Sequence, residues 1–149
     1  MEITKEEIIK GGEFITKQTK SDEIFTPEDF SEEQKMMRDA VKDFTDKEIW
    51  SKKHEFETHN YQLTADVMKK AGNLGFLGVN VPEEYGGLGM PFTSSMLVCD
   101  YISGSSGSTS TAFGAHTGIG TMPILLYGTD AVSYTHLRAH ETRHDLVCR

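Results

Sequence analysis

The chain has 149 residues, of which 37% are hydrophobic and 26% are charged, and its formal net charge is −8. This length is typical of a single domain, and a domain of about 150 residues buries roughly two-thirds of the surface of its unfolded chain. The negative charge disfavours nonspecific binding of nucleic acid, because a surface that binds phosphates needs the opposite sign.

The composition also bears on the cellular compartment. No unbroken apolar run is long enough to span a bilayer, so no membrane span is predicted. Residues 1–7 are charged from the start and lack the apolar core of a secretory signal. Cys99 and Cys148 are far apart and do not suggest a disulfide framework. We therefore expect a cytoplasmic protein.

Residues 1–30 are predicted to be an N-terminal lead-in. They contain two short apolar clusters, Ile8-Ile9 and Phe14-Ile15, on either side of the break at Gly11-Gly12, and a turn at Thr26-Pro27 follows. We expect this segment to lie over the surface of the domain without forming a core element.

Two amphipathic helices are expected next. Ser31 and Gln34 have the spacing of a capping box, which predicts a helix from about residue 32 to about residue 50. A second helix is predicted over residues 62–73. Each has one apolar stripe at helical spacing: Met37, Val41 and Phe44 in the first, and Leu63, Val67, Ala71 and Leu74 in the second.

The middle of the chain is rich in glycine. Residues 74–90 combine five glycines with aliphatic side chains, which predicts a sharply bent but buried connector. A third helix is expected over 91–103, with Val98 and Ile102 on one face. Residues 103–110 read as a turn or flexible segment, because they hold five serines and two glycines. A fourth, apolar helix is expected over 111–126.

The last nineteen residues differ in composition from the rest. Residues 131–149 contain three of the six histidines and three arginines but no lysine. His140-Glu141-Thr142-Arg143-His144 fits the H-E-x-x-H pattern, in which two histidines one turn apart hold Zn²⁺ and the glutamate is the general base. The pattern fixes only three positions, and a catalytic zinc also needs a third protein ligand and a cleft. We therefore predict no metal site.

Three blocks of the sequence, 31–44, Leu74–Met90 and 115–129, occur in the order seen in one enzyme family. Together they resemble the N-terminal helical domain of the acyl-CoA dehydrogenases, the flavoenzymes that desaturate fatty acyl thioesters. The likeness covers roughly residues 1–130 and is greatest to the very-long-chain branch. It implies an all-α helical bundle over 31–130, with the middle β-domain and the C-terminal α-domain of the family absent from this chain.

The resemblance also implies a reaction. In the family a carboxylate removes the α-proton of a fatty acyl-CoA and the β-hydride passes to FAD, as a step of β-oxidation; an electron-transferring flavoprotein then accepts the electrons. The base and the flavin contacts lie in the absent regions, so we expect no catalytic or cofactor-binding residue here and an inactive fragment. The full-length protein would be a homo-oligomer.

The substrate contacts that the resemblance implies lie on the fourth helix, which lines the deep end of the acyl tunnel in the family. The expected lining residues are Ala112, Ala115, His116, Gly118 and Ile119. Small side chains here would leave room for a long acyl chain, since each buried methylene of substrate contributes about 0.8 kcal/mol. Alternatively, the small residues only let two helices pack closely, and His116 only bonds to a backbone carbonyl.

The resemblance stops near residue 130, where the family continues with an acidic helix. The tail, residues 131–149, looks like a translated sequencing adapter, and we predict that it is non-native and that His140 and His144 are not biological metal ligands. Two other functions are kept open: a zinc-dependent hydrolase built on His140, Glu141 and His144, and a helical interaction module without chemistry of its own.

Overall fold

A computed structural model describes residue 9, residues 12–58 and residues 60–138. Every regular element in this part of the chain is a helix, and no β-strand occurs in it, which confirms the all-α prediction. None of the helices there has the length and hydrophobicity that crossing a bilayer requires.

The chain divides into two compact units, residues 1–35 and residues 36–149. The first contains these elements: α1 (Glu13–Thr16), the 3-10 turns η1 (Ser21–Glu23) and η2 (Pro27–Asp29), and the start of α2 (Glu32–Glu48). The rings of Phe25 and Phe30 pack edge to face, with centroids 5.3 Å apart. The predicted capping box is confirmed: Gln34 N donates to Ser31 Oγ at 3.2 Å, and Ser31 N donates to Gln34 Oε1 at 3.0 Å.

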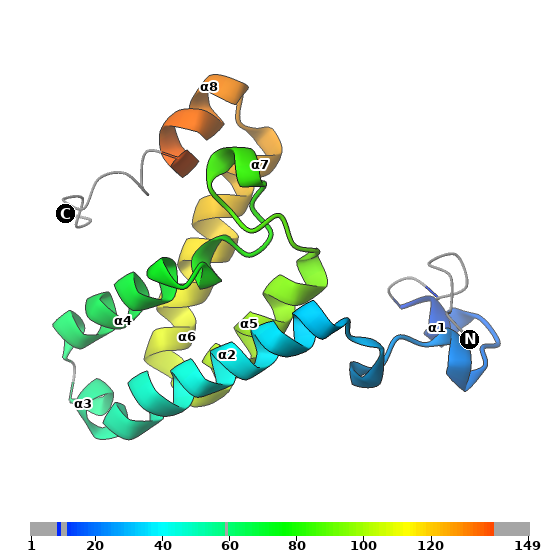
Figure 1. Cartoon of the computed structure of the whole chain (residues 1–149), viewed down its shortest axis with the longest axis horizontal. Coiled ribbons are helices and arrows are strands. Elements are labelled where there is room, and N and C mark those ends of the chain that lie inside the picture. Colours follow the sequence, from blue (N-terminus) through cyan, green and yellow to red (C-terminus); the bar gives the residue numbers. More distant parts are fainter. Residues whose placement is uncertain (1–8, 10–11, 59, 139–149) are drawn as a thin grey trace. The chain divides into compact units, whose positions relative to one another are not determined.

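The second unit is built on longer helices, namely the rest of α2, α4 (Tyr61–Asn73), α5 (Phe92–Ser105), α6 (Gly107–Gly114) and α7 (Met122–Tyr127). Shorter elements connect and extend them: η3 (Trp50–Lys52), α3 (Lys53–Glu57), η4 (Phe76–Gly78), η5 (Glu83–Tyr85), α8 (Asp130–Ser133), and the π-helical segments η6 (Ala115–Thr121) and η7 (Tyr134–Arg138). In Figure 1, α6, η6 and α7 form one continuous rod that passes behind α2 and α4.

The core of this unit lies where α2, α4, α5 and α6 meet. The predicted apolar stripes supply most of it, including the buried residues Val41, Phe44, Val67, Ala71, Val98 and Ile102. The ring of Phe44 packs edge to face against that of Phe76, at 5.4 Å between centroids. Leu74 is an exception, since 55% of it is exposed: the helix ends at Asn73, and the left-handed Gly75 (φ 79°) then turns the chain.

The prediction of a flexible linker over residues 103–110 was wrong, whereas a turn is present there and is confined to Ser106. Helix α5 continues to Ser105 and α6 begins at Gly107, so only Ser106 is extended (φ −158°, ψ 131°). The serine hydroxyls form local hydrogen bonds, Ser105 Oγ to Tyr101 O at 2.8 Å and Ser110 Oγ to Ser103 Oγ at 3.0 Å. Small side chains with such bonds allow α5 and α6 to reverse direction through a single residue, which composition alone could not distinguish from a linker.

The predicted connector, residues 74–90, is buried and held by its own backbone. Leu88 N donates to Gly78 O, Gly89 N to Val81 O and Met90 N to Val79 O, at 2.8–3.0 Å. Phe76, Val79, Val81 and Met90 are all buried. The connector is therefore a compact loop that returns the chain from the end of α4 to the start of α5.

Candidate functional site

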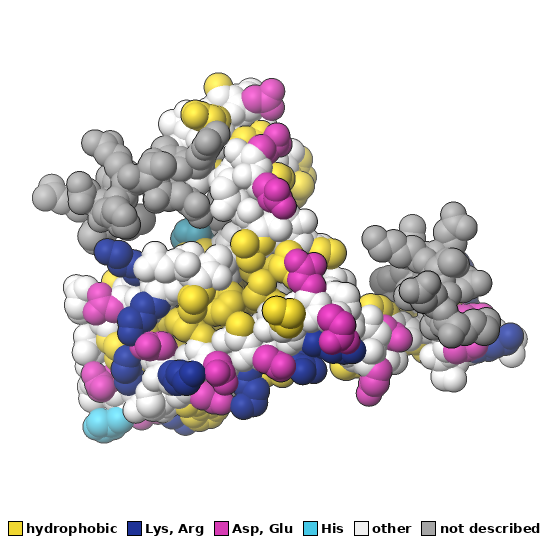
Figure 2. All heavy atoms as spheres, viewed as in Figure 1, with side chains coloured by type: hydrophobic (Ala, Val, Ile, Leu, Met, Phe, Trp, Pro, Cys, Tyr) yellow, Lys and Arg dark blue, Asp and Glu magenta, His cyan; other side chains and the backbone are white. Residues whose placement is uncertain are grey.

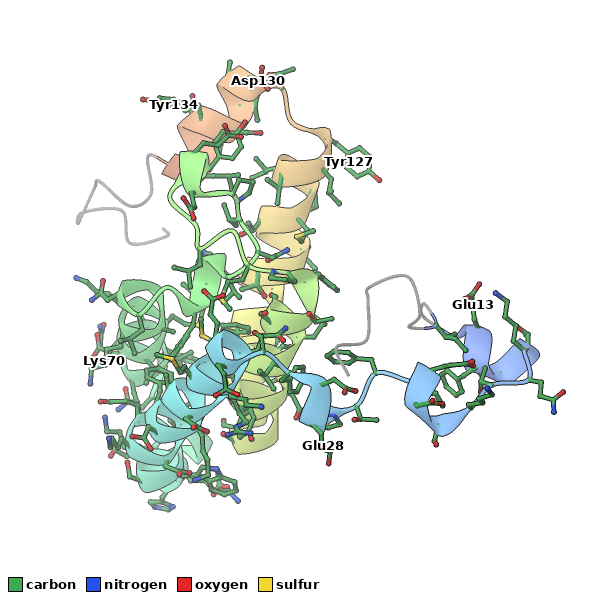
Figure 3. All side chains as sticks on the ribbon, turned by 45° about the vertical axis from the view of Figure 1, so that its right-hand side comes forward. Glu13, Glu28, Lys70, Tyr127, Asp130 and Tyr134 are labelled. Carbon is green, nitrogen blue, oxygen red and sulfur yellow. The ribbon has the colours of Figure 1, made fainter. Side chains whose placement is uncertain are left out.

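The residues expected to contact substrate lie on one rod and mostly face outward in this chain. Ala115, His116, Gly118 and Ile119 are exposed, Ile119 to 80%, while Ala112 is half-buried at the edge of the core. The structure therefore brings all five onto consecutive turns of α6 and η6. Further along the rod, Leu126 (62% exposed) and Tyr127 (86%) continue the apolar surface, and Figure 3 shows Tyr127 projecting away from the end of α7.

The glycines of this rod are not covered by another part of the described chain. A Cβ atom added at Gly114 or Gly118 would meet no other heavy atom within 4 Å. Gly87 differs sharply, because a Cβ there would overlap Val81. Close helix packing within the described residues therefore does not account for the absence of side chains at Gly114 and Gly118.

The middle of the rod is a π-helix, which sequence analysis missed. Over Ala115–Thr121 the helix is wider than an α-helix, and α-helical pairing resumes where Met122 N donates to Gly118 O. Thr121 Oγ1 donates to His116 O, five residues back, at 2.8 Å. The available signal was Pro123, because a proline inside a helix clashes with the carbonyl four residues earlier, here that of Ile119.

This face cannot supply a catalytic base from a carboxylate. Residues 111–128 contain no aspartate or glutamate, and their side chains are apolar, hydroxyl-bearing or, at His116, an imidazole. Glu83 and Glu84, the paired carboxylates of the connector, are exposed on η5. Partial burial, followed by the charges of Glu84 and Asp130, raises the pKa of the Tyr85 hydroxyl. The exposed face can line a channel for an apolar chain, but it holds no carboxylate that could act as the base.

A second feature is the open groove between α2 and α4, with a volume of about 270 Å³. Figure 2 shows apolar side chains gathered between these two helices, with charged side chains along the borders. Glu48 accepts hydrogen bonds from Lys52 Nζ (2.8 Å) and Lys70 Nζ (2.6 Å), which hold the pKa of its carboxyl below the usual range. The ion pair between Glu48 and Lys70 joins α2 to α4 across this groove, and we assign no cofactor to it.

The H-E-x-x-H pattern, for which no metal site is predicted, falls in the last part of the chain. His140, Glu141 and His144 lie outside the described residues. His136 is exposed, and its Nδ1 lies 3.0 Å from Val132 O. Within the part of the chain that the structure describes, no group of three potential ligands could hold a metal ion.

The first described turns of the predicted tail are helical. Thr129 Oγ1 accepts from Val132 N at 3.4 Å at the start of α8, and the buried Ser133 donates through its hydroxyl to Ile124 O at 3.2 Å. These contacts attach residues 130–133 to α7.

Comparison with known proteins gives a consistent result. Residues 31–140 match the sequence model of the acyl-CoA dehydrogenase N-terminal domain. The chain is 40% identical over 124 residues to a probable acyl-CoA dehydrogenase of Bacillus subtilis (strain 168), covering 83% of the chain and 21% of that protein.

Two solved structures are also similar. The crystal structure of an acyl-CoA dehydrogenase complexed with FAD from Bacillus anthracis superposes with a TM-score of 0.79 and 39% identity, covering 87% of this chain and 22% of that one. A structure described as the electron transferring flavoprotein of Acidaminococcus fermentans gives a TM-score of 0.67 and 27% identity, over 76% of this chain and 30% of that one. The chain thus spans about a fifth to a third of the length of these proteins.

Proposed function

Because the chain belongs to the acyl-CoA dehydrogenase family, which it matches over the N-terminal domain, we propose that it forms one wall of the acyl channel of a flavin-dependent acyl-CoA dehydrogenase. The observation that carries this proposal is the uncovered rod of α6 and η6, where Ala115, Gly118 and Ile119 face outward and no described neighbour fills the space above Gly118. An apolar face without a carboxylate suits the binding of a hydrocarbon chain.

The activity of the whole protein is part of the same proposal. It would oxidise the α,β carbon–carbon bond of a fatty acyl-CoA, with FAD as the hydride acceptor and an electron-transferring flavoprotein as the electron acceptor, in the β-oxidation of lipids. The matched crystal structure of the Bacillus anthracis relative contains FAD, which supports the cofactor. The 149 residues alone would be inactive, because the resemblance places the catalytic base and the flavin contacts in the family's middle and C-terminal domains. A homo-oligomeric enzyme in the cytoplasm is proposed on the resemblance and the composition.

A preference for long acyl chains is proposed from side-chain volume, in keeping with the likeness to the very-long-chain branch. Ala112, Ala115 and Gly118 leave space that a longer substrate can fill, and each extra buried methylene contributes about 0.8 kcal/mol. His116 would stand at the edge of this space, because its side chain is exposed beside Ala115.

The experiment is a chain-length profile of the complete enzyme, from butyryl-CoA to eicosanoyl-CoA, for the wild type and Ala115→Leu. The added side chain lies at an exposed position of this unit, so the fold should tolerate it. The optimum of kcat/KM should move to shorter substrates, with a loss of about fourfold for each methylene displaced from the channel. Ala65→Leu, the same substitution at an exposed position of α4 outside the rod, is the matched control and should leave the optimum unchanged. If the optimum of kcat/KM is unchanged in Ala115→Leu, Ala115 does not line the channel.

The origin of the tail remains a separate proposal. The change in composition supports a non-native segment over 131–149, whereas the family match, which reaches residue 140, counts against its first ten residues. Resequencing of the genomic locus tests it: a native reading frame that keeps these codons would refute it. The zinc hydrolase alternative has no support among the described residues. It would be supported if the chain had a chelator-sensitive peptidase activity that is lost when residues 131–149 are deleted.

A further inference from the structure

The π-helical segment η6 interrupts the rod that we assign to the acyl channel, and two residues account for it. Pro123 has no N–H for the carbonyl of Ile119, and its ring would collide with that carbonyl in an α-helix. Widening of the preceding turn relieves this conflict. The hydroxyl of Thr121 donates a hydrogen bond to His116 O at 2.8 Å, in addition to the five-residue backbone pairing of the π-helix.

The wide turn changes which side of the rod each residue faces. Phe113 is 1% exposed and lies in the core, and nine residues later Met122 Sδ accepts a hydrogen bond from Asn80 Nδ2 at 3.3 Å. Asn80 directly follows the buried Val79, so it lies beside the core of the second unit. The side chains of Phe113 and Met122 therefore both face this core. At about 100° per residue, an unbroken α-helix would put residues nine apart on opposite sides. One additional residue in the turn reduces the angle to about 80°.

The register of η6 therefore determines the directions of the residues that lie within it. Ala115, His116, Gly118 and Ile119 all fall in the wide turn, and all are exposed. Segments of π-helix occur frequently at functional sites, where they re-aim side chains in this way.

We propose that Thr121 is a positioning residue: its hydroxyl, together with the ring of Pro123, holds residues 115–121 in the π register and so determines which of their side chains face the acyl chain. The register itself is a property of this chain. The consequence for the acyl chain rests on the proposed function.

The first test measures the register in the 149-residue chain, by through-hydrogen-bond NMR couplings to the carbonyl of His116. Thr121→Val keeps the shape of the side chain and removes the donor, while Thr121→Ser keeps the hydroxyl. The wild type and the serine variant should couple His116 O to the amide of residue 121, and the valine variant should couple it to the amide of Gly120. Pro123→Ala is a second route to the α register if Thr121→Val does not fold. Retention of the five-residue pairing in the folded variants without the hydroxyl or the proline overturns the proposal.

The second test uses the complete enzyme and the ratio of kcat/KM for palmitoyl-CoA to that for octanoyl-CoA. Thr121→Val should change this ratio by about fourfold or more, the effect of one methylene, and Thr121→Ser should restore it. A changed register with an unchanged ratio refutes the positioning role but leaves the dehydrogenase function intact. If the wild-type enzyme desaturates no acyl-CoA, the proposed function fails and the positioning role fails with it, whereas the NMR result still decides what Thr121 does to the helix.

Discussion

Replacing Gly87 with alanine should destabilise the second unit by about 2–4 kcal/mol. A Cβ at this position would lie 2.5 Å from Val81 Cβ and 2.6 Å from the Val81 carbonyl carbon, well inside van der Waals contact. Forcing extra volume into a packed site typically costs about 1–3 kcal/mol. The backbone would also have to move where Gly87 N donates to Pro82 O (3.2 Å) and Gly89 N donates to Val81 O (2.8 Å). Weakening these two bonds, without losing them, adds about 1 kcal/mol in all.

Urea denaturation of the 149-residue chain, followed by circular dichroism at 222 nm (a helix signal), measures this cost as a shift of the midpoint. Gly104→Ala is the matched control, because Gly104 lies within α5 and a Cβ there meets nothing within 4 Å. That variant should be more stable than the wild type, by up to about 1 kcal/mol, through helix propensity. Equal midpoints for the two variants would show that Val81 can move away freely, and the account of the connector as a rigid loop would be wrong.

Two further predictions concern buried and charged groups. Glu48→Gln should destabilise the chain by about 0.5–1 kcal/mol at pH 7, because the bonds from Lys52 and Lys70 link the end of α2 to η3 and to α4. The pKa of Glu48 is lowered in the folded state, so its carboxylate stabilises the fold above the ordinary glutamate pKa of about 4.3 and loses this effect as the pH falls. The free energy of unfolding of the variant should therefore decrease less than that of the wild type when the pH is lowered. Thr109→Val should be neutral or stabilising, by up to about 1 kcal/mol in thermal unfolding, because Thr109 Oγ1 is buried and has no hydrogen-bond partner among the described residues. Thr45→Val, which removes the bond from Thr45 Oγ1 to Lys42 O, should instead be destabilising, and the reverse order of these two variants would contradict the argument.

The helices of the core could be predicted because their signals are local. The capping box at Ser31 sets the start of α2, and Asn60, whose Oδ1 accepts from Leu63 N at 3.1 Å, sets the start of α4. The buried positions Val67 and Val98 follow from a 3.6-residue repeat, which needs no knowledge of the partner helix. The fold class followed from these patterns together with the family resemblance.

The features that sequence analysis missed depend on contacts between segments or on competition within a helix. Residues 103–110 have the composition of a linker, yet Ser105 and Thr109 are buried in a tight helical reversal. The π-turn before Pro123 results from a conflict between the proline ring and one carbonyl, which the apolar pattern of 111–126 does not record. The end of α4 at Asn73 depends on the left-handed Gly75, so the stripe could not show that Leu74 would be exposed.

The candidate site illustrates why glycine content alone is ambiguous. Gly87 and Gly118 are the same residue type in two glycine-rich segments, but a Cβ at Gly87 would overlap Val81, whereas one at Gly118 would meet nothing in the described chain. A glycine whose substitution is blocked inside the unit is needed for the fold of that unit. A glycine that faces open space lowers helix stability by about 1 kcal/mol relative to alanine, and no contact within the unit offsets this loss. The acyl chain that we propose for this face, or a second helix packed against it, would occupy the space above such a glycine.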